Sequence, residues 1–148
     1  MTAKLHLTKR INHSKNFFAD QYGKDELEKI RLETLNSYDT MKFLVTLENK
    51  FFPTADQIME TAIKTDYIMQ NANKFGVSES GIEKKVDYMH ISSVLILEHW
   101  LLNILPKQTQ NPITRQQLGN EETGWIFAMQ VMTDLFKKCN ELEEQFKM

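Results

Sequence analysis

The chain of 148 residues carries a formal net charge of −2, with 41% hydrophobic and 26% charged residues. This length suits one domain, and the composition is that of an ordinary soluble globular protein rather than of a polyanion-binding one. The single cysteine, Cys139, excludes an intrachain disulfide and any zinc site built on paired cysteines, and the lack of a run of 18 apolar residues predicts no membrane span.

Helices are expected throughout, because only 5 glycines and 3 prolines are present to form turns. Segment 1–22 is expected to form a short helix or an arm that lies across the other helices. Segment 24–52 contains no glycine or proline, and its apolar residues recur at steps of three, four or their multiples. That spacing predicts one helix with a single apolar face, and Pro53 ends it because its ring and missing N–H interrupt the hydrogen-bond ladder.

Two capping-box sequences mark the starts of the following helices. Thr54–Gln57 precedes a helix predicted over 55–75, and Ser80–Glu83 precedes one predicted over 81–105. Pro106 is expected to end the second of these helices.

The last helix is predicted over 120–146. Its apolar residues follow a 4-3-4-3 spacing typical of a buried helix–helix seam: Trp125, Met129, Met132, Phe136 and Cys139. Gly124, near the start, is expected to allow the close approach of a neighbouring helix. Together the segments predict an all-α fold in one domain over 1–148, an antiparallel four-helix-bundle-like arrangement with an additional N-terminal helix or arm.

The most apolar stretch, LILEHWLL over 95–102, contains a carboxylate and an imidazole at its centre. His99 shares a helical stripe with three polar residues, which predicts a solvated face; they are Lys85, Ser92 and Asn103. Glu98 lies on a mostly apolar stripe instead. We therefore expect Glu98 either to pair with a cationic or hydroxyl group of another helix or to belong to a site.

Two pairs of carboxylates suggest an enzymatic alternative. Asp56 and Glu60 are four residues apart, as are Glu83 and Asp87, so on adjacent helices they would offer the oxygen ligands that Mg²⁺ prefers. The alternative is an all-α, Mg²⁺-dependent nucleotide pyrophosphohydrolase, with Glu98 as base or orienting group. Acidic residues at four-residue steps are equally typical of a solvated helix face, so the first expectation is that no metal or other cofactor is bound.

Aromatic doublets suggest a surface for another protein. Adjacent residues of a helix point in different directions, so one ring of Phe17–Phe18 and one of Phe51–Phe52 is expected to leave the core. Trp100 is the fifth candidate contact residue, and such rings suit protein partners.

We therefore expect a small cytoplasmic helical protein that binds another protein, or itself as a homodimer, rather than an enzyme. Secretion chaperones, toxin-neutralising immunity proteins and host-directed inhibitors all fit this profile equally. The N-terminal sequence lacks the apolar core and cleavage site of a secretory signal, which agrees with a cytoplasmic location. A second alternative to the binding protein is a nucleic-acid-binding regulator that uses the basic N-terminal arm; its cations are Lys4, Lys9, Arg10 and Lys15.

Overall fold

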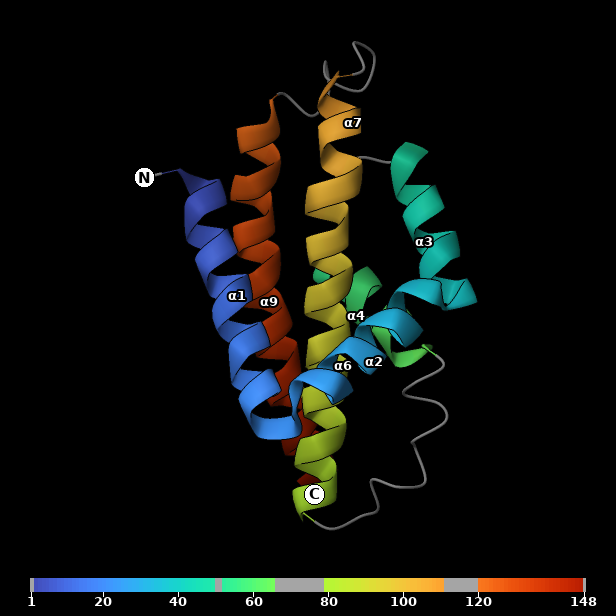
Figure 1. Ribbon diagram of the computed structural model, residues 1–148, viewed down its shortest axis with the longest axis vertical. Helices are drawn as coiled ribbons and strands as arrows, with labels where there is room; N and C mark the ends of the chain where they lie inside the picture. The colour runs from blue at the N-terminus through green and yellow to red at the C-terminus, as the bar shows by residue number, and fades with distance from the viewer. Residues whose placement is uncertain (1, 50–51, 66–78, 111–119, 148) are drawn as a thin grey trace.

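The computed structural model describes residues 2–49, 52–65, 79–110 and 120–147, and these contain helices and no strand. The all-α prediction is confirmed. The elements are α1(Ala3–Tyr22), α2(Lys24–Asn36), α3(Tyr38–Asn49), α4(Ala55–Ile63), α6(Glu79–His99), the π-helical segment η1(Trp100–Ile104), α7(Leu105–Gln110) and α9(Glu121–Lys147) (Figure 1).

Three long helical columns define the shape of the molecule. Helices α1 and α9 run side by side in the same direction, and α6, η1 and α7 form a third column that runs the opposite way (Figure 1). The parallel pair is fixed at its N-terminal end, where the Ala3 N–H donates to Glu122 Oε1 at 2.8 Å. Glu122 thus satisfies a backbone donor that a helix start leaves unpaired, and its charge suits the positive end of the α1 dipole.

Helix α1 is a full element of the core rather than the arm or short helix expected over 1–22. It spans 20 residues, and Thr2 caps it by accepting a hydrogen bond from the Leu5 N–H. Its buried face recurs at steps of three and four: Leu7, Ile11, Ser14 and Phe18. This face was visible in the sequence, but the hydrophobic residues Leu5 and Phe17 between its members obscured it, and both are exposed.

The single helix predicted over 24–52 is wrong, because the chain breaks at Ser37. Ser37 has φ −63° and ψ 139°, an extended conformation that separates α2 from α3. Helix α2 crosses α6 obliquely (Figure 1), and Thr34 Oγ1 and Ser92 Oγ share a hydrogen bond of 3.0 Å at that crossing. Ser92 is fully buried, so the solvated stripe predicted for it is also wrong.

The helix predicted to end before Pro106 instead continues through it. Proline lacks an N–H and its ring collides with the carbonyl four residues earlier, so a regular α-helix cannot include it without a distortion. The π-helical segment η1 provides that distortion, since the Leu105 N–H bonds to the Trp100 carbonyl, five residues back. Asn103 Nδ2 also donates to the His99 carbonyl at 3.3 Å, beside the widened turn.

Helix α4 starts as predicted and covers another side of α6. Thr54 accepts from the Gln57 N–H and Gln57 Oε1 accepts from the Thr54 N–H, each at 3.1 Å, so the capping box is confirmed. Helix α4 packs mainly on α6 and also touches α9. The helix predicted over 55–75 is too long, because α4 ends at Ile63 with Lys64 as its C-cap; residues 66–75 lie outside the described part of the chain. The Ser80 side chain also lies outside it, although α6 itself begins at Glu79.

The seam predicted for the last helix is confirmed at three of its five positions. Trp125, Met132 and Cys139 are buried, whereas Met129 is half-buried and Phe136 is 38% exposed. Gly124 allows the predicted close approach, since a Cβ built there would lie 2.6 Å from both methyl carbons of Leu105. Within the described ranges, no helix is long and apolar enough to cross a membrane.

Candidate functional site

The aromatic residues predicted to bind a partner have different surroundings. Phe17 is 57% exposed on α1, whereas the adjacent Phe18 is buried. Trp100 is completely buried, and Phe52 is half-buried against it and stacks on Phe127 with centroids 4.4 Å apart. Phe51 lies outside the described residues. Of the four candidates that the structure describes, Phe17 is therefore the one that presents a largely exposed ring.

The five carboxylates of the enzymatic alternative do not come together. Asp56 pairs with Lys138 of α9, and Glu60 pairs with Lys64 of the adjacent turn. Asp87 faces Tyr22 on another side of α6, with Glu83 near it. Over the described residues, no three His, Cys, Asp or Glu side chains are arranged to hold a metal ion.

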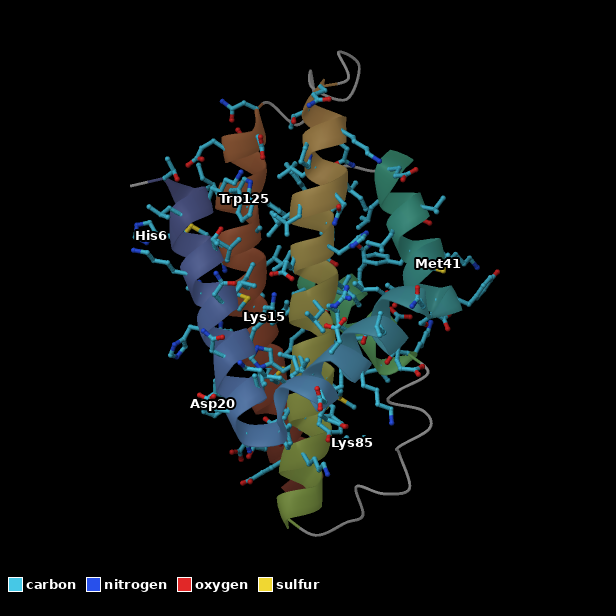
Figure 2. All side chains as sticks on the ribbon, viewed as in Figure 1. His6, Lys15, Asp20, Met41, Lys85 and Trp125 are labelled. Atoms are coloured by element: carbon cyan, nitrogen blue, oxygen red, sulfur yellow. The ribbon has the colours of Figure 1, made fainter. Side chains whose placement is uncertain are left out.

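Glu98 pairs with a cation of another helix, which is one of the two alternatives expected from its position on an apolar stripe. Lys15 Nζ of α1 lies 3.2 and 3.1 Å from the two carboxylate oxygens of Glu98. Figure 2 labels Lys15 in the middle of α1, on the column that packs against α6. Both side chains are partly buried, so the pair ties α1 to α6. Lys4 likewise pairs with Glu121 at 3.7 Å, and the Arg10 guanidinium lies 5.9 Å from the ring centroid of Phe136 on α9. Three of the four cations predicted to contact nucleic acid therefore contact a neighbouring helix.

A different site forms where α1, α6 and α9 meet. A pocket of about 270 Å³, here called the aromatic pocket, opens there to solvent. Each helix contributes residues from one face, at steps of one, three and four. The lining residues are His13, Ser14, Phe17 and Phe18 of α1, Val86, Asp87 and His90 of α6, and Phe136, Cys139, Asn140 and Glu143 of α9.

His90 is the most unusual group in this pocket. Its ring meets those of Phe18 and Phe136 edge-on, with centroids 5.5 and 4.4 Å away, and only 7% of the residue is exposed. Its Nε2 has no hydrogen-bond partner among the described residues. Burial lowers the pKa of His90 to about 4, because the apolar surroundings disfavour the imidazolium. A neutral imidazole with an unsatisfied ring nitrogen therefore lines the aromatic pocket.

Carboxylates line the other side of the pocket. Tyr22 donates a hydrogen bond of 2.6 Å to Asp87 Oδ2, which orients this carboxylate. Desolvation raises the pKa of Asp87 despite that bond, and the nearby charges of Glu143 and Glu83 raise it further. Burial, followed by the Asp87 hydrogen bond and charge, also raises the pKa of Tyr22, so the phenol keeps its proton. Three carboxylates are thus close enough to repel one another at this edge.

The chemistry that these groups support is recognition rather than nucleophilic attack. Cys139 is buried, and burial raises the pKa of its thiol to about 12, so the thiolate required of a nucleophile is not formed at neutral pH. An apolar lining with a few polar groups is the usual character of a binding pocket. A larger hollow of about 420 Å³ lies between α4 and α9, but the exposed Asp56–Lys138 ion pair lines it, and it is more open.

Sequence reasoning did not combine the residues of this pocket. Phe136 was assigned to the buried seam, and His90 was not assigned to a pocket. One signal was available: Val86 and His90 are four residues apart, which places His90 on the apolar face of its helix. The sequence did not show that α1 and α9 would bring aromatic rings to both sides of that imidazole.

Comparison of the chain with protein-family models, curated proteins and solved structures finds no match.

Proposed function

We propose that this protein acts by binding another protein, and that the aromatic pocket receives an apolar side chain of that partner. The observation that carries the proposal is the buried His90 with its unsatisfied Nε2, placed between Phe18 and Phe136 in a pocket open to solvent. Phe17 and Phe136 extend the apolar surface outward from it. Protein interfaces concentrate their binding energy in such desolvated pockets bordered by aromatic rings.

The size of the pocket favours a single side chain as its occupant. Its volume of about 270 Å³ is just below the roughly 300–1,000 Å³ of pockets that hold drug-sized ligands. Helical columns surround the pocket as a bundle-like scaffold. The Ala3–Glu122 hydrogen bond and the Lys15–Glu98 ion pair hold these columns together. A preformed pocket of this kind binds an anchor residue without a large ordering cost.

A second copy of the chain is a poor occupant of the same face. In a two-fold dimer the same patch of both copies meets, so the carboxylates of Asp87 and Glu143 from both copies would be brought into one interface. Like charges brought together at an interface are unfavourable. The proposal is therefore a different protein, in preference to the homodimer.

The geometry does not favour the nucleotide hydrolase, because its carboxylates are distributed over separate ion pairs and helix faces. The aromatic pocket does not distinguish a chaperone from an immunity protein or an inhibitor. Each of these classes would use it to hold a partner.

The test is a parallel affinity purification of three tagged proteins from their native cells: wild type, Phe17→Ser and Tyr38→Ser. Tyr38, on α3, is 75% exposed and lies away from the pocket, so it provides a matched control for losing an exposed aromatic ring. We expect a stoichiometric partner to be retained by wild type and by Tyr38→Ser and to be lost from Phe17→Ser. A partner retained by all three, or the absence of any partner, would overturn the proposal.

A further inference from the structure

The imidazole of His90 is enclosed at the point where it meets the aromatic pocket. Only 7% of the residue is exposed, and its Nε2 has neither a hydrogen-bond partner among the described residues nor access to solvent. Phe18 of α1 and Phe136 of α9 meet the imidazole edge-on, at interplanar angles of 85° and 77°. This enclosure suits the neutral ring, because a buried charge without a partner is costly.

The imidazolium does not fit the same enclosure. Protonation gives both ring nitrogens an N–H, so Nε2 becomes a donor, and none of the described residues accepts a hydrogen bond from it. Burial is accordingly the cause that lowers the pKa of His90 to about 4. A protonated His90 therefore needs water at Nε2, and water reaches this atom only when a side chain that covers it moves.

Phe136 is the ring that can move at the smaller cost. Phe18 belongs to the core and is 5% exposed, whereas Phe136 is 38% exposed and lines the pocket. An outward rotation of Phe136 uncovers little further apolar surface, while a shift of Phe18 would disturb the close-packed core. The guanidinium of Arg10, 5.9 Å from the Phe136 centroid, is a contact that such a rotation would break.

From this geometry we infer that His90 is a pH switch for the aromatic pocket: protonation of its ring displaces the Phe136 side chain and releases the partner. This inference rests on the proposed function and specifies how the same site is regulated. An apolar anchor that entered the open pocket would have to remove water from a cation, which is unfavourable. Acidification therefore releases the partner, and a return to neutral pH restores the pocket.

The size of the effect follows from the two protonation equilibria. The closed pocket holds the pKa of His90 at about 4, whereas a solvated histidine has a pKa of 6.5, so the open pocket binds more protons in this range. The ratio of open to closed molecules should therefore rise about 25-fold when the pH decreases from 7.5 to 5.

Other charged or titratable groups face the pocket from the same three helices: Arg10 and His13 of α1, Asp87 of α6 with Glu83 near it, and Cys139 and Glu143 of α9. Helices α2 and α4, which also pack on α6, contribute no described residue to the lining. Desolvation raises the pKa of Asp87, so protonation of this carboxyl favours its buried state and opposes the opening. Burial raises the pKa of Cys139 to about 12, so its thiol does not titrate in this range.

Fluorine NMR on the whole chain tests the displacement of the ring. The probe is 4-fluorophenylalanine in place of Phe136 and, in a separate control protein, in place of Phe127. Phe127 is half-buried on the same helix, stacks on Phe52 and lies outside the pocket lining. A soluble gadolinium chelate broadens the signal of an exposed ring, so the signal reports how far each ring is exposed at each pH.

We expect the ring at position 136 to become exposed between pH 7.5 and pH 5 and the ring at position 127 to remain as it is. The midpoint at position 136 should coincide with protonation of the His90 ring, which its own NMR signals report in the same protein. The variant His90→Gln should abolish the change. His13→Gln, Asp87→Asn and Glu143→Gln, which remove the other groups of the pocket that could titrate, should retain it. No exposure in wild type, or a midpoint different from that of His90, would overturn the switch.

Elution of the partner separates this inference from the function on which it rests. The partner captured by wild type at pH 7.5 should be released at pH 5, and His90→Gln should retain it at both values. Retention by wild type at pH 5 would overturn the release. Failure to capture any partner at pH 7.5 would overturn the proposed function and the release with it, whereas the fluorine signal still decides whether His90 displaces Phe136.

Discussion

The imidazole of His90 stands nearly perpendicular to the phenyl ring of Phe136, with an interplanar angle of 77° and centroids 4.4 Å apart. The two residues come from antiparallel helices, α6 and α9, and Phe136 is the more exposed of the pair. The contact places a titratable group at the boundary between the core and the aromatic pocket. Both the pH dependence of stability and the proposed binding function follow from it.

The stability of the fold should fall between pH 6.5 and pH 4 because of His90. Its pKa is lowered by burial to about 4 in the folded chain, against 6.5 when unfolded, so in this range the unfolded state binds more protons. The contribution of His90 to the free energy of unfolding is therefore complete above pH 6.5. It decreases as the pH falls toward 4, by about 3 kcal/mol at most. Denaturant unfolding at several pH values measures the loss.

The variant His90→Gln isolates that contribution, because glutamine does not titrate. Partial burial also lowers the pKa of His99, and desolvation raises the pKa of Asp87, which contributes with the opposite sign. Both groups are present in wild type and variant alike, so the difference between the two pH profiles reports His90. Parallel profiles from pH 6.5 to 4 would show that His90 is not held neutral by the fold.

Substitutions of the adjacent Phe17 and Phe18 should change the free energy of unfolding by very different amounts. Phe18 is 5% exposed and Phe17 is 57% exposed, although their rings are in contact with centroids 5.4 Å apart. Phe18→Ala should cost about 3–5 kcal/mol, the range for a buried phenylalanine, whereas Phe17→Ala should cost under about 1 kcal/mol. Urea unfolding checks both values. Similar costs for the two substitutions would contradict the assigned faces of α1.

Gly124→Ala should destabilise the protein even though alanine is the better helix former. The new Cβ would lie 2.6 Å from the methyl carbons of Leu105, so this fully buried side chain would have to shift to accept it. Overpacking of this kind costs about 1–3 kcal/mol, which offsets and exceeds the roughly 1 kcal/mol gained in helix propensity.

The effect of Gly124→Ala should change from destabilising to stabilising when the Leu105 side chain is shortened. In a Leu105→Ala background the methyl carbons are absent, so Gly124→Ala should then stabilise the protein relative to Leu105→Ala alone. Thermal or denaturant unfolding of the four proteins completes the cycle. Destabilisation of the same size in both backgrounds would show that the contact with Leu105 is not the cause.

The Lys15–Glu98 pair should contribute a measurable coupling between α1 and α6. A double-mutant cycle with Lys15→Met and Glu98→Gln should give about 0.5–1 kcal/mol, toward the upper end for ion pairs because both groups are partly buried. Raising the salt concentration to about 1 M should reduce this coupling, since a partly exposed pair is screened. A coupling of zero at low salt would indicate that the ion pair does not stabilise the fold.

The sequence was most informative about elements whose signals are local. The Thr54–Gln57 capping box and the seam of α9 follow from spacing and from hydrogen-bonding groups within one helix; the capping box was predicted correctly, and the seam was predicted correctly at Trp125, Met132 and Cys139. The break at Ser37 was missed because no glycine or proline marks it. The continuation through Pro106 was missed because it depends on a π-helical segment, which spacing does not predict.

The candidate site was less predictable, because it depends on which helices meet. Because Glu98 lies on a mostly apolar stripe, the sequence indicated that it would pair with a group of another helix or belong to a site. Lys15 of α1 is its partner. His90 and Phe136 are 46 positions apart in the numbering of the chain, and only packing brings them within 4.4 Å. Phe17 was predicted as a contact residue from its doublet alone, and it is exposed, whereas Phe18 and Trp100 belong to the core.

Site-specific photo-crosslinking in the native cells tests the central claim most directly. The photoreactive amino acid p-benzoyl-phenylalanine would replace Phe17 at the pocket and, in a separate protein, Tyr38 on α3. We predict that irradiation joins the position-17 protein to one partner of defined mass and that the position-38 protein gives no such product. The same product from both positions, or none from position 17, would contradict a partner bound in the aromatic pocket.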